Sequence, residues 1–192
     1  MKTGIFGGTF NPPHTGHLIV AEYVREKISL DKVVFVSSAV PPHKQDLDIV
    51  EAHHRLEMLQ CAVQGNRYFE VSDIEVRRGG VSFTVDTLVE FRGRSPDDHL
   101  YFLIGMDNLR DFDTWKMGEK IVDVAEIVAM TRPGFKQENF GTKHKSEIVL
   151  CDVPEVAISS RDIRERVKTG KSIRYLVPGS VETYITRNHL YR

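Results

Sequence analysis

Two histidines follow a glycine-rich loop near the start of the chain, in the stretch GGTFNPPHTGH at residues 7–17. A loop that leaves a parallel strand and enters a helix presents unpaired N–H groups at the positive end of the helix dipole, and both features favour bound anions. Gly7 and Gly8 let a phosphate approach the backbone because they carry no side chain. The imidazoles of His14 and His17 can donate hydrogen bonds to such an anion. The stretch therefore predicts a phosphate site with two histidines at its edge.

The loop differs from the common nucleotide-binding loops, because neither GxGxxG nor GxxxxGK[ST] fits residues 4–17. We predict a helix over about residues 14–28, whose apolar face runs from Ile28 through Val24 and Ala21 in steps of four and three. The same face continues onto His17 and then His14. Both rings are therefore expected on the sheet-facing side of the first helical turn, where the sheet ends and a cleft opens.

The two histidines have two other interpretations, a structural role in the core or helix cap and a zinc site. A single histidine on an apolar face is more often a core or cap residue, but two on one turn above a glycine loop favour a functional role. A zinc site would gain further nitrogen ligands from His43, His53 and His54, yet HExxH and His-Asp are absent from the sequence. His53 and His54 also lie off the apolar face of their predicted helix, where we expect them to be solvated. The prediction is that no protein side chains form a metal site.

Short β-rich runs alternate with amphipathic segments, which is typical of βαβ units around a parallel sheet. Strands are expected at residues 3–6, 32–38, 69–76, 99–105, 126–130 and 146–153. Helices are expected at about 14–28, 51–64 and 83–92, and in SSRDIRERVKTG and PGSVETYITRNHLY. The second helix should bury one stripe of Ala52, Leu56, Leu59 and Val63. The pattern predicts one α/β domain over 1–192, a doubly wound parallel sheet with helices on both faces and a small helical C-terminal cap over about 159–192.

Composition excludes several classes of protein. The 192 residues include 26 basic and 27 acidic ones, a balance that disfavours a broad nucleic-acid surface. No apolar run approaches the length of a membrane span, and MKTGIFGGTF lacks the apolar core of a secretory signal. Cys61 and Cys151 stand far apart without a CxxC motif, so we expect neither a disulfide framework nor a thiolate zinc site, and a reduced cytoplasmic location. Composition leaves open whether the chain forms a homo-oligomer.

The glycine and histidine stretch closely resembles the GGTFDPxHxGH signature of the nucleotidyltransferase superfamily that shares the HxGH motif. Six further blocks in the same order resemble the bacterial nicotinate mononucleotide adenylyltransferases: PPHK at 41–44, HRLEML at 54–59, SFTVDTL at 82–88, GMDNLRDFDTW at 105–115, RPG at 132–134 and ISSRDIR at 158–164. The resemblance spans nearly the whole chain and implies a Rossmann-like fold. Two positions depart from the family pattern, since Asn11 replaces the commoner Asp and Arg161 stands where Thr is frequent.

The resemblance implies transfer of the adenylyl group of ATP to nicotinate mononucleotide, which gives deamido-NAD and pyrophosphate. His14 and His17 would be the catalytic residues. The expected ATP-binding residues are Gly7, Gly8, Thr9, Phe10, His17, Gly105, Asp107, Ser159, Ser160 and Arg164. Ser159 and Asp162 also have the spacing of a helix capping box, while Arg164 would reach the β- and γ-phosphates. Mg²⁺ is expected as an ion bound to ATP, because the sequence shows no dedicated carboxylate cage.

The same resemblance assigns the acceptor site. Its expected residues are Lys44, Thr84, Trp115, Lys116 and Arg132. Trp115 would stack on the pyridine ring, and the N–H groups of Thr84 and Lys116 would meet the nicotinate carboxylate. Alternatives are an acceptor of another kind, either nicotinamide mononucleotide or phosphopantetheine, a nucleotide-binding sensor without turnover, and a zinc-dependent hydrolase.

Overall fold

The strands form one all-parallel sheet in the order β3-β2-β1-β4-β5-β6, within the part of the chain that the computed structural model describes, residues 1–42, 49–131 and 148–192. The strands are β1 (Lys2–Gly8), β2 (Lys32–Ser37), β3 (Phe69–Ser72), β4 (His99–Gly105), β5 (Glu126–Thr131) and β6 (Ile148–Asp152). In the register, Ile5 of β1 lies opposite Val34 of β2 on one side and Phe102 of β4 on the other. The parallel α/β fold predicted from the alternation of segments is confirmed.

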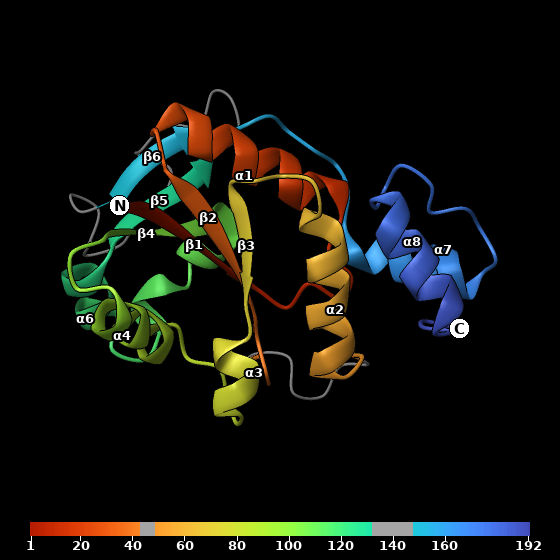
Figure 1. Ribbon diagram of the computed structural model, residues 1–192, viewed down its shortest axis with the longest axis horizontal. Helices are drawn as coiled ribbons and strands as arrows, with labels where there is room; N and C mark the ends of the chain where they lie inside the picture. The colour runs from red at the N-terminus through yellow and green to blue at the C-terminus, as the bar shows by residue number, and fades with distance from the viewer. Residues whose placement is uncertain (43–48, 132–147) are drawn as a thin grey trace.

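The direction in which strands are added reverses between β1 and β4 (Figure 1). Strands β2 and β3 extend the sheet on one side of β1, whereas β4, β5 and β6 extend it on the other. The connections that leave β1 and β4 therefore diverge onto different faces of the sheet. Such a reversal leaves a crevice outside the carboxyl ends of the two strands, which is where open α/β sheets bind ligands.

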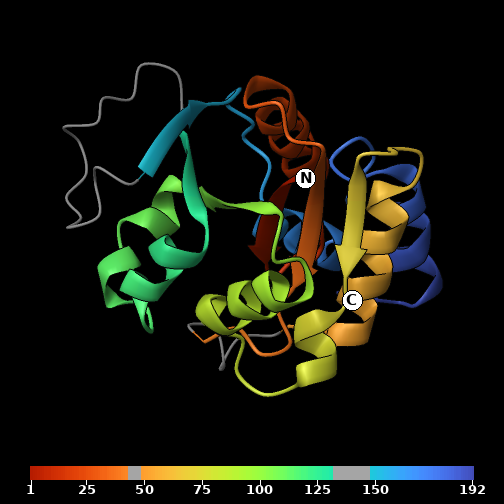
Figure 2. The same cartoon turned by 60° about the vertical axis from the view of Figure 1, so that its left-hand side comes forward.

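Helices cover both faces of the sheet. On one face lie α1 (Thr15–Lys27) and α2 (Ala52–Val63). The other is covered by α3 (Ile74–Arg78), α4 (Thr84–Arg94), α5 (Met106–Leu109), the short 3-10 helix η1 (Phe112–Thr114) and α6 (Gly118–Val124). Neighbouring residues of one strand point to opposite faces, so Phe102 packs under α4 and α6 while Leu103 packs in the cluster of α1 and α2. Figure 2 shows the two helical layers on either side of the strands.

The C-terminal helices α7 (Ser160–Lys168) and α8 (Gly179–Arg187) lie beside α2, away from the strands (Figure 1). A third apolar cluster joins them, with Met58 and Ala62 of α2 against Ile163 of α7 and Val181 of α8. The hydroxyl of Ser180 also donates a hydrogen bond to the Cys61 carbonyl at 2.8 Å. No helix of the described residues has the length and apolar character needed to cross a membrane.

The predicted buried stripe of α2 was wrong in three of its four members. Leu59 is fully buried, but Ala52, Leu56 and Val63 are only partly buried. The other fully buried side chains of the helix are Arg55, Met58 and Ala62. The reason is that α2 packs against the sheet on one side and against α7 and α8 on the other, so its buried face is wider and turned relative to a stripe that faces the sheet alone.

The predicted strand over 69–76 is also too long, because β3 ends at Ser72 and α3 begins at Ile74. The register pairs Ser72 with Val36, and β2 ends one residue later at Ser37. A longer β3 would have no partner strand. The chain turns instead, and the Ser72 hydroxyl accepts a hydrogen bond from the N–H of Ile74 at 3.3 Å.

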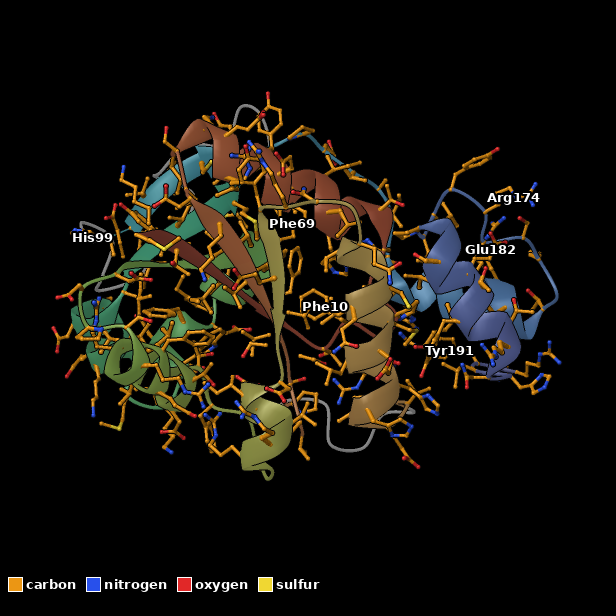
Figure 3. The ribbon with its side chains drawn as sticks, in the orientation of Figure 1. Phe10, Phe69, His99, Arg174, Glu182 and Tyr191 are labelled. Carbon is orange, nitrogen blue, oxygen red and sulfur yellow. The ribbon has the colours of Figure 1, made fainter. Side chains whose placement is uncertain are left out.

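Phe35 supports the core beneath the glycine loop and gives a test of the packing. It is fully buried, and its ring centroid lies 5.5 Å from that of Phe6, 5.9 Å from Phe10 and 5.1 Å from Phe69. Phe10 and Phe69 are labelled in Figure 3. We expect Phe35→Ala to lower the free energy of unfolding by about 3–5 kcal/mol, because the cavity cannot close between three neighbouring rings. Urea unfolding measures this loss. Tyr175→Ala is the control, since Tyr175 is 83% exposed, and an equal loss in both variants would contradict the packing.

Candidate active site

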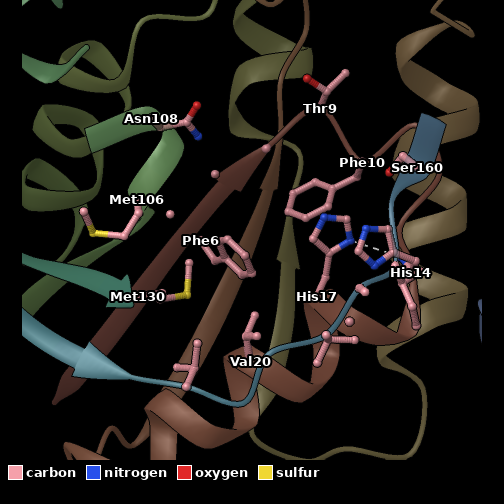
Figure 4. Close-up of a pocket in the computed structure, with 18 of the residues that line it drawn as sticks. Phe6, Thr9, Phe10, His14, His17, Val20, Met106, Asn108, Met130 and Ser160 are labelled. Atoms are coloured by element: carbon pink, nitrogen blue, oxygen red, sulfur yellow. Dashed lines mark hydrogen bonds between the residues drawn. The ribbon is translucent and has the colours of Figure 1, made fainter. Parts of the chain in front are cut away.

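A cavity of about 840 Å³ opens at the carboxyl ends of β1 and β4 (Figure 4). Its walls come from the loop after β1, the first turn of α1, the end of β4 and the first turns of α7. It brings together these predicted residues: Gly7, Gly8, Thr9, Phe10, His14, His17, Gly105, Ser160 and Arg164. Segments more than 140 positions apart in the sequence therefore meet at one crevice.

His14 and His17 form a stacked pair at the N-terminus of α1 (Figure 4). Their ring centroids are 3.6 Å apart and the ring planes differ by 19°. The backbone N–H of His14, the residue that caps the helix, donates to Nδ1 of His17 at 3.1 Å. Because Nδ1 accepts this bond, the neutral His17 ring carries its hydrogen on Nε2. The predicted juxtaposition of the two rings at the first turn is confirmed.

His14 is nearly buried, with 8% of its surface exposed. Its Nδ1 has no hydrogen-bond partner among the described residues. Burial lowers the pKa of His14 from 6.5 to about 4, so the ring is neutral at pH 7. A buried, unpartnered ring nitrogen beside a helix N-terminus is costly to maintain, which is typical of a group reserved for a ligand.

Aromatic side chains hold His17 from the other side. The ring centroids of Phe10 and Phe6 lie 5.0 and 6.2 Å from that of His17, both in edge-on arrangements. Gly8 makes this packing feasible, because a Cβ there would lie 2.9 Å from the Phe10 ring. Gly16, between the histidines, is equally constrained, since a Cβ there would lie 3.0 Å from Nδ1 of His14. The small residues of the motif thus make room for the rings as well as for a ligand.

Helix α7 braces the loop that connects β1 to α1. The hydroxyl of Ser160 donates to the Pro12 carbonyl at 2.7 Å, and Nη1 of Arg164 donates to the Asn11 carbonyl at 2.9 Å. The Tyr191 hydroxyl donates to Oδ1 of Asn11 at 2.8 Å. Burial raises the pKa of the Tyr191 phenol, so it stays a hydrogen-bond donor. The loop that carries the histidines is therefore held from the C-terminal segment.

Ser159 caps the N-terminus of α7. Its hydroxyl accepts the N–H of Asp162 at 3.1 Å, which is the helix cap that the spacing predicted. Ser159 is not among the residues that line the cavity, whereas Ser160 is. Its place in the ATP site stays a prediction.

A second cavity, of about 460 Å³, adjoins the first. The two share Phe6, Gly7, Gly8, Thr9, Gly105 and Asn108 in their walls. Thr84, Trp115 and Lys116 line the second cavity, as predicted for one site. The Trp115 ring packs on Phe112 at a centroid distance of 5.6 Å. The Lys116 ammonium pairs with Asp86 at 3.1 Å, so its side chain has a partner outside the cavity.

Several residues of the two cavities were missed by sequence reasoning. Asn108 and Arg110 line the larger cavity, and Glu75 and Ser82 line the smaller. Burial raises the pKa of the Glu75 carboxyl, which accepts the Thr87 hydroxyl at 2.5 Å. The overlong strand predicted over 69–76 hid Glu75, whereas the block SFTVDTL already contained Ser82 and carried the signal for it.

The remaining predicted residues lie outside the two cavities or outside the described residues. Lys44, Arg132 and His43 lie outside the described residues, as does the side chain of Asp107, which belongs to α5. His53 is exposed, as expected, and lies 3.1 Å from Glu51. His54 was expected to be solvated, but it is partly buried and its Nδ1 lies 2.9 Å from the Tyr184 hydroxyl, because α8 packs over α2. Within residues 1–42, 49–131 and 148–192, no three His, Cys, Asp or Glu side chains are grouped to hold a metal ion.

Comparison with known proteins agrees with this architecture. A family model described as cytidylyltransferase-like matches residues 5–166. The nicotinate-nucleotide adenylyltransferase of Bacillus subtilis is 40% identical, over 99% of this chain and 98% of its own. A Thermus thermophilus protein named "Probable nicotinate-nucleotide adenylyltransferase" is 46% identical over the full length of both chains. A solved structure of Plasmodium falciparum nicotinic acid mononucleotide adenylyltransferase complexed with NaAD superposes with a TM-score of 0.78 at 22% identity, over 100% of this chain and 98% of the other.

Burial of neutral His14 predicts a pH-dependent stability. As the pH falls below 6.5, the unfolded chain binds a proton on His14 before the folded chain does, down to a pKa of about 4. The stabilisation that comes from burying neutral His14 is therefore fully present above pH 6.5, and it is lost as the pH falls toward 4. Between pH 7.5 and 4.5 we expect the wild type to lose roughly 2.5 kcal/mol more than His14→Asn. Urea unfolding at both pH values measures the difference, and parallel losses in the two proteins would contradict a neutral His14.

Proposed function

Because this chain belongs to the nicotinate-nucleotide adenylyltransferases, within the cytidylyltransferase-like family, we propose that its larger cavity binds ATP and its smaller one nicotinate mononucleotide. The enzyme transfers the adenylyl group of ATP to nicotinate mononucleotide and forms deamido-NAD and pyrophosphate. One observation supports the assignment of the cavities above the others. The histidine pair at the start of α1 lines the larger cavity, and the two cavities share Gly7, Gly8 and Thr9 at the end of β1.

The chemistry is one in-line displacement. An oxygen of the mononucleotide phosphate attacks the α-phosphorus of ATP, a new P–O bond forms, and the bond to the β-phosphate oxygen breaks. Pyrophosphate leaves with the electron pair, and no covalent enzyme intermediate is needed. Such transfers depend on the positions of the reactants and on stabilisation of the charge that moves to the leaving group.

The histidines supply hydrogen bonds to that charge. Nε2–H of His17 is a donor because Nδ1 is engaged by the His14 backbone. His14, neutral in the free enzyme, can either donate as the neutral ring or take up a proton when the phosphates arrive, since neighbouring negative charge raises a histidine pKa. The first turn of α1 adds its N–H groups and dipole.

The remaining assignments complete the two sites. Ser160 and Arg164, at the start of α7, stand at the larger cavity where the β- and γ-phosphates would extend. Trp115 would stack on the pyridine ring, with the backbone N–H groups of Thr84 and Lys116 toward its carboxylate. Gly105, Asp107, Ser159, Lys44 and Arg132 keep the roles that the family resemblance implies. Magnesium would enter with ATP, held by the triphosphate, because the described residues contain no cluster of metal ligands.

Release of pyrophosphate tests the proposed acceptor. We expect turnover with ATP, magnesium and nicotinate mononucleotide, and a kcat/KM for nicotinamide mononucleotide lower by at least about 100-fold, because N–H donors that fit a carboxylate are mismatched by an amide. Phosphopantetheine serves as a third acceptor. A preference for nicotinamide mononucleotide or phosphopantetheine would assign the second cavity to that acceptor instead. If no acceptor gives pyrophosphate, the protein would be a nucleotide-binding sensor without turnover.

His17→Ala tests the role of the histidine pair. We expect kcat to fall by about 100-fold or more, with KM for ATP little changed, because the lost donor acts in the transition state. His53→Ala is the matched control, since its side chain is 58% exposed and lies outside both cavities. Wild-type turnover in His17→Ala would remove His17 from the mechanism.

A further inference from the structure

Arg55 of α2 is the largest fully buried side chain among the described residues, with 1% of its surface exposed. Its Nε donates to the Val50 carbonyl at 3.0 Å, and its Nη2 donates to the Ala39 carbonyl at 2.9 Å. Its Nη1 donates to the Thr9 carbonyl at 2.9 Å and to the Ser37 hydroxyl at 3.0 Å. A second hydroxyl, that of Ser38, accepts from Nη1 at 3.5 Å. The partners are therefore three backbone carbonyls and two hydroxyls, and no carboxylate of the described residues forms an ion pair with Arg55.

A buried guanidinium that no carboxylate of the described residues pairs with is energetically costly in a core. An apolar side chain of similar volume avoids the desolvation cost, which repeatedly makes buried charges neutral or unfavourable for stability. Burial lowers the pKa of Arg55, yet a guanidinium stays protonated in proteins, so the charge remains. Stability alone therefore does not account for this residue.

Two acceptors of Arg55 line the cavities, and a third is bonded to a residue that lines one of them. Thr9, at the end of the glycine loop, lines the larger and the smaller cavity. Ala39 follows β2, and its N–H donates to the Ser82 hydroxyl at 2.8 Å. Ser82 in turn lines the smaller cavity, beside Phe83 and Thr84. One guanidinium thus joins the loop of the adenylyl side to the wall of the acceptor side.

The direction of these bonds also orients the glycine loop. The Thr9 carbonyl accepts a hydrogen bond from Nη1 of buried Arg55, while Thr9 also lines both cavities. A carbonyl that turned the other way would place negative charge where the phosphates of ATP bind. Arg55 holds that carbonyl away and leaves its own positive charge behind the loop.

We propose that Arg55 is a positioning residue that sets the separation of the two substrates, by holding the Thr9 and Ala39 loops with one branched side chain. This inference rests on the proposed function, since it requires ATP and the acceptor to occupy the two cavities. It predicts that loss of Arg55 damages the reaction between the substrates more than the binding of either one. A misplacement of about 1 Å costs on the order of 100-fold in such reactions.

Arg55→Lys and Arg55→Ala test the proposal in the full-length enzyme. We expect kcat to fall about tenfold in Arg55→Lys, which keeps the charge but loses the branched donors, and about 30- to 100-fold in Arg55→Ala. The dissociation constant of nicotinate mononucleotide should change by less than about threefold. It is measured from the fluorescence of Trp115, the one tryptophan of the chain, which lines the acceptor cavity. Guanidinium, added well below unfolding concentrations, should restore part of the turnover of Arg55→Ala and none of the turnover lost in Arg55→Lys.

Arg92 provides the matched control. It also donates to carbonyls from separate segments, those of Pro96 and Asp98 at 3.1 and 2.5 Å and of Val124 at 2.9 Å, but at the amino ends of β4 and β5. Arg92→Ala should lower the unfolding temperature, keep the kcat of the folded enzyme and show no guanidinium rescue.

The outcomes separate the two proposals. Wild-type kcat in folded Arg55→Lys, or a loss matched by Arg92→Ala at equal unfolding temperature, would overturn the positioning role. If Arg55→Ala does not fold, the proposal is tested with Arg55→Lys alone. Its kcat and its dissociation constant for nicotinate mononucleotide, measured from Trp115 fluorescence, then decide. Absence of pyrophosphate release in the wild type would overturn the proposed function, and the role of Arg55 with it.

Discussion

The reversal of strand order between β1 and β4 is the constraint on which the other features depend. Two parallel strands that lie side by side send their connections to opposite faces of the sheet, so no covering helix can close the gap at their carboxyl ends. The neighbouring elements then line the gap. The N-terminus of α1 and the terminal Gly105 of β4 lie at this edge, together with Ser160 and Arg164 of α7. The cavity is a consequence of topology, and the side chains only determine which ligand it accepts.

Aromatic side chains pack together beneath the loop that forms the floor of this crevice. Phe6, Phe10 and Phe35 pack beneath it, and a stacked pair of histidines stands on this aromatic support. Fixed placement matters for the displacement proposed above, because its rate depends on the distance and angle between two bound substrates. The cost is visible in His14, whose ring is held neutral and without a partner for Nδ1 among the described residues.

Local sequence patterns predicted the features that depend on residues close together in the chain, such as the positions of helices. Periodicity located α1, α2 and α4 to within a few residues and placed His14 and His17 on one turn. The predictions that were wrong concern features that depend on elements distant in the sequence. Nothing in the apolar spacing of α2 shows that α7 and α8 cover its second side, and the end of β3 depends on where β2 stops. Arg55 was missed for the same reason, because an arginine in a helix is ordinarily solvated, and four of its five acceptors come from segments that only the fold brings beside it.

The hydrogen bond between Tyr191 and Asn11 spans 180 positions of the chain. During synthesis, the loop that holds the histidines leaves the ribosome early, whereas the phenol that secures Asn11 follows long afterwards. The strands and α1 can assemble while the loop still lacks this contact and those of Ser160 and Arg164. A chain that stops short of α7 therefore contains the histidines without the braces that hold their loop in place.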